Sequence, residues 1–390
     1  MTLDEKLRNL KAELMHRKAR IMIIGLGSVG SYLLDYLMSE GDENIEIVVA
    51  GRNFEKMETD MNIVRVASLI RGQNRTGITI EADADLNEVE SIRRSIERHT
   101  PDIIVNSSRA YSGLKYGSIS WAAFRAYGIW TPLSIKYTKN IMEAYSLARS
   151  KAVVINTSYS DAVIPWLKSA GKSYPDFGSG NVNHLVPRIK LALAEENKIH
   201  DWWNIDITYA TAHFHDVVIS KEGQTEGVAQ LIDADYKGRS LPVTDRTFAA
   251  CKISMPTDAK RNMMNASSNF EIIRGILDAV RSGTTTKVHS PGFGGNIGGY
   301  PVILDGSSDN PRAYIDESKF SLEQMREKNR ESIFLDGIEN VEDGKLFYTD
   351  ELIQKVWDKF SVTLPKCVDF SEIDAVAEFL IENIIEKAGK

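Results

Sequence analysis

The chain has 390 residues, of which 43% are hydrophobic and 26% charged, and its formal net charge is −7. This composition predicts a large folded core and favours two domains. No basic run stands out, so we expect no nucleic-acid partner, whose phosphates would require clustered lysine and arginine. The only cysteines, Cys251 and Cys367, lack CxxC or Cys/His spacing, which predicts no disulfide framework, no metal site and a reducing, cytoplasmic setting.

Residues 1–20 are expected to form an N-terminal helical extension. Leucines recur at helical spacing from Leu3 to Leu14, and Thr2 with Glu5 fits a capping box. The apolar stripe is expected to pack on the body of the protein or on a second subunit. No stretch approaches eighteen uninterrupted apolar residues, so we expect no membrane partner.

Residues 21–160 alternate short β-type runs with helical patterns, which predicts an α/β Rossmann domain with a doubly wound parallel sheet. The predicted strands are IMII, IEIVVA, ITIEAD, DIIVNSS (102–108) and AVVINTS (152–158). The predicted helices cover Ser28 to Glu40 and the regions near 54–70, 86–98 and 131–149. Together these elements predict an NAD(P)-binding domain.

In residues 161–390 the regular alternation of strand and helix patterns ends, which predicts an α+β substrate or catalytic domain. Helices are expected at 161–170, through IKLALAEE and from about Asn269 to Arg281, with a strand over 203–220. The glycine run 292–299 is predicted to be a flexible connection beside the active site, in preference to a phosphate-binding loop, and the charged tail is predicted to be helical.

Gly25, Gly27 and Gly30 form G-x-G-x-x-G directly after an apolar strand and at the start of a helix. In this context the first glycine permits a tight turn, the second admits a pyrophosphate and the third lets helix and strand pack closely. Free N–H groups at the helix start then face the phosphates. The pattern therefore predicts a dinucleotide cofactor.

The end of the second strand favours NADP over NAD. An acidic residue that binds the ribose hydroxyls of NAD is expected about twenty residues after the turn, but Gly51 and Arg52 stand there. A guanidinium would attract a 2′-phosphate instead of repelling it. The residues predicted to bind the cofactor are Gly25, Leu26, Gly27, Ser28, Val29, Gly30, Gly51, Arg52, Asn53, Ser107 and Ser108.

Several segments, in order along most of the chain, together resemble the lactate and malate dehydrogenase family. They include GLGSVGSYLLDYL, residues 55–85, AVVINTSYSDAVIPWLKSAG (152–171), GSGNVNHLVPRIKLALAEE (178–196), ATAHFHD and GGYPVILDG (298–306). The resemblance implies hydride transfer between a nicotinamide and a 2-oxo or 2-hydroxy acid, with a protonated histidine as the proton donor. It also implies a homodimer or homotetramer that binds a small-molecule substrate.

The resemblance implies roles for four residues, and a fifth, His184, is a separate candidate. The catalytic histidine falls on His213 or, less well, on His215; a strand would point the two in opposite directions, and we prefer His213. Arg188 corresponds to the carboxylate-binding arginine and Asn156 to the asparagine near the nicotinamide. His184 is a candidate second acid or hydrogen-bond donor, or alternatively a polar residue of the turn.

The sequence also departs from the family. Leu185, or His184 if one residue is inserted, occupies the position of the aspartate that orients the histidine, so this helix supplies no carboxylate; Asp216 lies beside the histidines in the sequence. The lid segment 109–121 keeps only Arg109 and Lys115 as positive charges.

Three functions remain open, in this order. The first is an NADP-linked oxidoreductase acting on a carbonyl or hydroxyl carbon, with His213 as acid/base and Arg188 as anion anchor. The second is an imine-reducing dehydrogenase of the saccharopine or opine type, suggested by DIIVNSS and the segment before it. The third is a non-catalytic NADP sensor or interaction protein, motivated by the missing aspartate and the altered lid.

Overall fold

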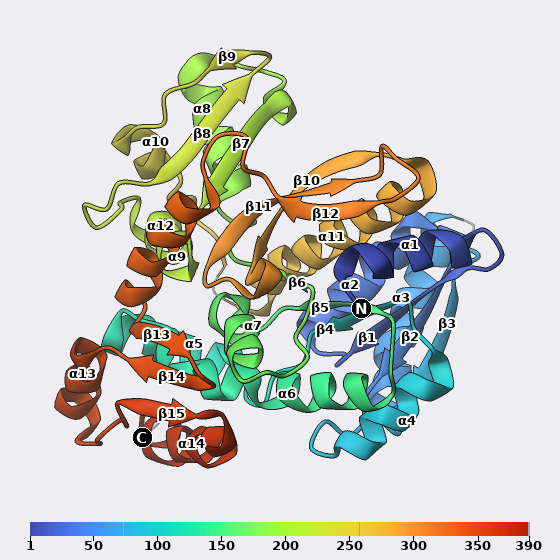
Figure 1. Cartoon of the computed structure of the whole chain (residues 1–390), viewed down its shortest axis with the longest axis horizontal. Helices are drawn as coiled ribbons and strands as arrows, with labels where there is room; N and C mark the ends of the chain where they lie inside the picture. Colours follow the sequence, from blue (N-terminus) through green and yellow to red (C-terminus); the bar gives the residue numbers. More distant parts are fainter. Residues whose placement is uncertain (73, 257, 389–390) are drawn as a thin grey trace.

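A six-stranded parallel sheet forms the centre of the amino-terminal part of the chain (Figure 1). The computed structural model describes residues 1–72, 74–256 and 258–388. The strand order is β3-β2-β1-β4-β5-β6, and every neighbouring pair is parallel. This is the doubly wound Rossmann order, so the predicted fold class is confirmed. The strands are β1 (Ala19–Ile24), β2 (Ile45–Ala50), β3 (Gly77–Glu81), β4 (Ile103–Asn106), β5 (Val153–Asn156) and β6 (Phe177–Gly178).

Strand β6 had not been predicted. Its two residues lie in the segment DFGSGN, which reads as a Gly/Asn-rich turn, yet Phe177 pairs with Ile155 and Gly178 with Asn156. The close approach requires glycine, because a Cβ on Gly178 would lie 2.0 Å from the carbonyl oxygen of Pro291. The sheet therefore extends beyond residue 160, while the proposed boundary between the two domains stays a prediction.

Alternate residues of the strands enter two separate hydrophobic cores. Ile21 and Ile23 of β1 lie in the core that includes α2 (Ser28–Glu40), α3 (Phe54–Arg71) and α11 (Asn262–Ser282). Met22 and Ile24 lie in the core formed with α4 (Val89–His99) and α6 (Thr131–Leu147). Because both faces are covered, the strands consist of continuous apolar runs rather than alternating ones.

Helix α1 (Leu3–Leu14) packs on the body of the protein, one of the two expected positions. It begins with the predicted capping box, in which the Thr2 hydroxyl accepts from the Glu5 N–H and the Glu5 carboxylate accepts from the Thr2 N–H. Leu7 and Leu10 are buried. Lys6 forms a buried ion pair with Asp176 at 2.7 Å, which joins the helix to the connection between β5 and β6.

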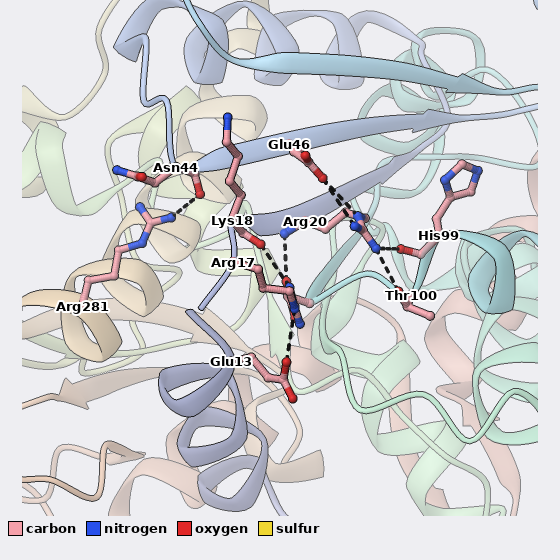
Figure 2. A network of polar contacts seen from close by, with 10 residues as sticks. Glu13, Arg17, Lys18, Arg20, Asn44, Glu46, His99, Thr100 and Arg281 are labelled. Atoms are coloured by element: carbon pink, nitrogen blue, oxygen red, sulfur yellow. Dashed lines mark hydrogen bonds and ion pairs between the residues drawn. The ribbon is translucent and has the colours of Figure 1, made fainter. Parts of the chain in front are cut away.

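Charged side chains tie together the amino ends of the central strands (Figure 2). Arg17 donates to both carboxylate oxygens of Asp102, at 2.6 and 2.8 Å. The same carboxylate accepts from the backbone N–H of Arg20 at 2.8 Å, and the Arg20 guanidinium donates to Glu46 and Thr100. These contacts link the starts of β1, β2 and β4 at the edge of the sheet opposite the glycine turn.

Two antiparallel sheets follow in the second half. The first contains β7 (Ile205–Ala210), β8 (Leu231–Tyr236) and β9 (Arg239–Ser240), and the second contains β10 (Thr285–Pro291), β11 (Gly299–Asp305) and β12 (Arg312–Ile315). The glycine run 292–299 is thus largely the β10–β11 connection. Gly292 packs against α7 (Ser160–Ser169), where a Cβ would lie 2.4 Å from the Ser160 carbonyl oxygen. This close packing contradicts the prediction of a flexible connection.

The predicted strand over 203–220 is wrong beyond Ala210. After β7 the chain starts a helix, α9 (His213–Glu222), although Val217, Val218 and Ile219 form a β-branched run. The helix start is stabilised by a distant residue, because the His213 backbone N–H donates to Oδ1 of Asp161 at 3.0 Å. Local propensity is overridden here by a tertiary contact.

The carboxyl-terminal residues form a small α/β unit rather than a helical tail. Helix α12 (Leu322–Leu335) leads into a three-stranded antiparallel sheet of β13 (Ile338–Glu342), β14 (Lys345–Tyr348) and β15 (Cys367–Asp369), which is accompanied by α13 (Asp350–Phe360) and α14 (Ile373–Leu380). This unit lies beside α6 and α7 (Figure 1). Buried Leu346, Tyr348 and Val368 extend the core that already contains α4 and α6. Among the described residues no helix is long and apolar enough to cross a bilayer.

Candidate active site

A cleft of about 1150 Å³ lies at the carboxyl edge of the parallel sheet. It is lined by residues that directly follow three strands: Gly25 after β1, Gly51 after β2 and Ser107 after β4. The winding of the sheet reverses between β1 and β4, and such a switch point is where open α/β sheets bind ligands. The second half of the chain closes the cleft with residues of α9 and the start of α11.

The three glycines of the turn have the geometry that a bound pyrophosphate requires. Gly25 adopts φ +90°, and a Cβ there would lie 3.0 Å from Cα of Ser108. A Cβ on Gly30 would lie 2.2 Å from the Gly25 carbonyl oxygen, so this glycine serves helix–strand packing and does not line the cleft. At Gly27, in contrast, a Cβ would meet nothing within 4 Å. The turn therefore leaves open space beside Gly27, where a phosphate group fits.

Helix α2 starts at this opening. Its N-cap residue, Gly27, forms no side-chain cap, so the first N–H groups of the helix remain available to a ligand. The neighbouring residues Leu26, Ser28 and Val29 also line the cleft. The Ser107 hydroxyl donates to the Gly25 carbonyl oxygen at 2.6 Å and holds the turn against the end of β4.

The end of β2 presents positive charge to the same cleft. Arg52, with a side chain 68% exposed, lines it together with Asn53 and Lys56. Asn53 caps α3 by accepting from the Lys56 backbone N–H at 3.0 Å. A guanidinium nitrogen of Arg52 lies 3.7 Å from a carboxylate oxygen of Asp85, so one acidic residue adjoins this end of the cleft. Arg52 and Lys56 are placed to attract a phosphate, with Asp85 as a partial counter-charge.

At the other end of the cleft, His213 faces a buried carboxylate. Its Nδ1 lies 2.8 Å from Oδ2 of Asp336, which is 1% exposed and follows α12. Asp336 is held in turn by the backbone N–H of Tyr127 at 2.7 Å and by the hydroxyl of Tyr159 at 2.7 Å. This arrangement fixes Nδ1–H as the proton that faces the carboxylate and leaves Nε2 for the cleft.

The ring of His213 is also fixed by packing. The ring of Tyr127 lies 4.7 Å from it and the ring of Tyr159 lies 5.3 Å away, edge to face. Tyr159 adopts φ 43° and ψ 51°, a left-handed conformation that is strained for a residue other than glycine. A strained residue persists only where the surrounding structure holds it in place. Such residues cluster at functional sites.

The surrounding charges decide the protonation of His213. Burial by itself lowers the pKa of His213, but the carboxylates of Asp336, Asp161 and Asp216 outweigh this effect and raise it above its ordinary value. Burial raises the pKa of Asp161 to about 6, against the opposing charge of His213. The surrounding carboxylates therefore favour the protonated form of His213, which is the form that a proton donor requires.

The other predicted catalytic residues differ in whether they line the cleft. His184 lines the cleft with His213, whereas His215, Arg188 and Asn156 do not. His215 is buried against Ser332 and the Thr225 carbonyl, and burial lowers its pKa to about 4. His213 and His215 were the two candidates for the catalytic histidine, and of these only His213 lines the cleft.

Arg188 and Asn156 instead form hydrogen bonds with groups in the interior of the protein. Arg188 is buried in α8 (Val186–Asn197) and donates to the Cys251 carbonyl at 3.0 Å. Asn156 is fully buried and its amide oxygen accepts from Asn106 at 2.9 Å, which joins the ends of β4 and β5. Other positively charged residues line the cleft, among them Arg109, Lys221 and Arg261. Within the described part of the chain, Arg109 forms no ion pair.

Sequence reasoning missed the orienting carboxylate. Asp336 lies 123 residues beyond His213, in a segment that reads as a charged helical tail. Tyr127 and Tyr159 were also missed, since neither belongs to a recognisable motif. The only sequence signal was negative: Leu185 in place of the family's aspartate indicated that a replacement had to come from elsewhere.

No protein-family model matches the chain, and a search of curated proteins gives no match. Solved structures that resemble it include a lactate dehydrogenase from a Medee basin deep-sea metagenome library, at 12% identity over 82% of this chain and 97% of that chain, with a TM-score of 0.49. They also include the malate dehydrogenase of Cryptosporidium parvum, at 12% identity over 82% of this chain and 98% of that chain, with the same TM-score of 0.49. These are proteins of the family that the sequence segments resemble. The Rossmann assignment itself rests on the strand order.

Proposed function

We infer that this protein is a nicotinamide-dependent oxidoreductase that uses NADP and interconverts the carbonyl and hydroxyl forms of a small anionic oxo or hydroxy acid. One observation carries the proposal: the His213–Asp336 pair opens into the same cleft as the glycine turn. A dinucleotide site and an oriented acid/base group in one cleft are what such a reaction requires.

A nicotinamide bound in the cleft would supply or accept the hydride at the carbonyl carbon. In the direction of reduction, His213 gives its Nε2 proton to the carbonyl oxygen, and the product is the alcohol. In the reverse direction, Nε2 takes the proton from the hydroxyl group. Asp336 stabilises the charged imidazole and keeps the ring in one orientation throughout.

The substrate's negative charge is assigned to the cations of the cleft. Arg188 was the candidate anchor, but it donates to an interior carbonyl and lies outside the lining residues. Arg109 lines the cleft beside Tyr127, carries no ion pair within the described part of the chain, and belongs to the predicted lid. We therefore assign the carboxylate of the substrate to Arg109.

NADP is supported by the end of β2, where Arg52 and Lys56 line the cleft and Gly51 replaces the expected acid. The fit of the pyrophosphate is supported by the open space at Gly27. Both observations concern binding alone, so they support the cofactor independently of the substrate.

The test combines binding and turnover. We expect fluorescence titration to show tighter binding of NADPH than of NADH, and a panel of 2-oxo acids to reveal NADPH oxidation. His213→Asn should lower kcat by about a hundredfold or more while NADPH binding is retained. His215→Asn is the matched control, and it should keep turnover.

Other outcomes would support one of the two remaining functions, imine reduction or cofactor sensing. NADPH oxidation that requires an added amine together with the oxo acid would identify an imine reductase. Cofactor binding without turnover across the panel would indicate a sensor. Equal turnover of wild type and His213→Asn would overturn the assigned acid/base role.

A further inference from the structure

A second histidine–carboxylate pair lies in the cleft beside His213. Nδ1 of His184 is 3.6 Å from Oδ2 of Asp216, and both residues line the cleft. His184 comes from the turn before α8, and Asp216 follows His213 by three residues in the first turn of α9. Residues with this spacing lie on one face of a helix, so His213 and Asp216 are neighbours in the cleft.

This pair is left with unsatisfied polar atoms. Oδ1 of Asp216 and Nε2 of His184 are buried and have no hydrogen-bond partner within the described residues. The Asp216 side chain is only 6% exposed. Buried carboxylate oxygens normally have partners, because the loss of hydration is otherwise uncompensated. Because both residues line the cleft, a polar group of a ligand bound there is the candidate partner for these two atoms.

The chemistry of the two atoms restricts that group. An ionised carboxylate only accepts hydrogen bonds, so the ligand has to donate to Asp216. Positive charges share this cleft: Lys221 and Arg261 line it, and Arg188 is close enough for the charge of Asp216 to act on it. Burial, together with the charge of Arg261, lowers the pKa of Lys221. A group of cations disfavours an ammonium group here but accepts a neutral donor.

We propose that His184 and Asp216 form a subsite for a hydroxyl group of the substrate, which makes the substrate a hydroxylated oxo acid rather than a simple aliphatic one. A hydroxyl donates its single proton to Oδ1 of Asp216 and accepts from the Nε2–H of His184, so one group provides a partner for both unpaired atoms. The inference rests on the proposed function and specifies its substrate class. Asp216 and His184 are positioning and specificity residues in this scheme, while His213 transfers the proton.

Binding tests the subsite without turnover. The protein saturated with NADP+ is titrated by calorimetry with pairs of 2-oxo acids that differ by one hydroxyl, such as 2-oxobutanoate and 4-hydroxy-2-oxobutanoate. We expect the hydroxylated member to bind at least about tenfold more tightly, as a hydrogen bond to a charged group would give. Equal binding would overturn the subsite, as would tighter binding of a third member that carries an ammonium in place of the hydroxyl.

Turnover of the same pairs separates the two proposals. If both members are reduced with NADPH at equal kcat/KM and bind equally, the proposed function stands and the subsite is wrong. If the hydroxyl strengthens binding but no member is reduced, the subsite stands and the proposed reaction is wrong.

Variants test whether Asp216 and His184 are the residues that bind the hydroxyl group. Asp216→Asn should bring the ratio of the two binding constants close to one, and Asp245→Asn, which changes an exposed aspartate in the same way, should keep the wild-type ratio. If thermal unfolding shows that Asp216→Asn does not fold, His184→Gln carries the same expectation. A wild-type ratio in a folded Asp216→Asn or His184→Gln variant would contradict the assignment to that residue.

Discussion

Asp336 lies 2.8 Å from Nδ1 of His213, although 123 residues separate the two in the chain. The carboxylate is supplied by the segment between α12 and β13, and the histidine by the first residue of α9. This contact connects the carboxyl-terminal unit to a histidine that lines the cleft. It also leads to the first of four predictions.

Replacing Asp336 by Asn should lower kcat for reduction by about a hundredfold or more and shift its pH dependence. The carboxylate raises the pKa of His213 against the effect of burial, so its loss lowers that pKa. Because reduction requires the protonated imidazole, the rate of the variant should decline at a lower pH than that of the wild type. Profiles of kcat/KM against pH measure the shift, and an unmoved alkaline limb would contradict the role of Asp336.

Two glycines of the same turn should respond differently to alanine. Gly27→Ala adds a methyl group where nothing lies within 4 Å, so the fold should tolerate it while NADPH affinity falls by at least about tenfold. Gly30→Ala places its methyl group 2.2 Å from the Gly25 carbonyl oxygen, so the free energy of unfolding should fall by a few kcal/mol. Urea unfolding and NADPH titration of both variants check this. A Gly27→Ala variant that binds NADPH normally would place the pyrophosphate elsewhere.

Arg52→Glu should reverse or abolish the preference for NADPH over NADH. The substitution replaces a cation in the cleft by an anion, next to Asp85. Arg75→Glu offers a matched control, since Arg75 pairs with Glu43 and does not line the cleft. Dissociation constants for both cofactors are the measurement. Equal affinities in the wild type, or an unchanged ratio in Arg52→Glu, would remove the basis for NADP.

His215 should make the fold sensitive to acid. Burial lowers its pKa to about 4, below its ordinary value near 6.5, so between these pH values the unfolded chain binds a proton that the folded chain does not. Stability attributable to His215 is therefore present above about pH 6.5 and is lost as the pH falls toward 4.

In His215→Gln, the slope of the unfolding free energy against pH should be smaller by up to about 1.4 kcal/mol per pH unit in this window. His200→Gln applies the same substitution at an exposed histidine. Urea unfolding at several pH values gives both slopes, and identical slopes in wild type and His215→Gln would contradict the burial of a neutral imidazole.

The cofactor half of the molecule was predictable because its signals are local. The apolar runs of β1, β2, β4 and β5 follow from burial on both faces, and the glycine turn follows from the three close approaches it has to make. Strand β6 was not predictable in this way. Its two residues join the sheet through pairing with β5 and through contact of Gly178 with Pro291, neither of which leaves a periodic pattern.

The catalytic half depends on contacts between distant segments. His213 was proposed from the resemblance, but the backbone N–H at the start of its helix donates to Asp161, 52 residues earlier, and the sequence around His213 reads as a strand. Arg188 has a plausible position in the sequence, yet the fold turns its guanidinium toward Cys251. Side-chain direction at such sites is set by packing, which a single sequence does not display.

Because Asp336 lies late in the chain, it is synthesised after both the glycine turn and His213. The strands that carry the glycine turn leave the ribosome before α12 and the segment that follows it. A nascent chain can therefore acquire a cofactor-binding turn while its histidine still lacks an orienting partner. Under the proposed function, the His213–Asp336 pair is complete only once the carboxyl-terminal unit has docked beside α6 and α7.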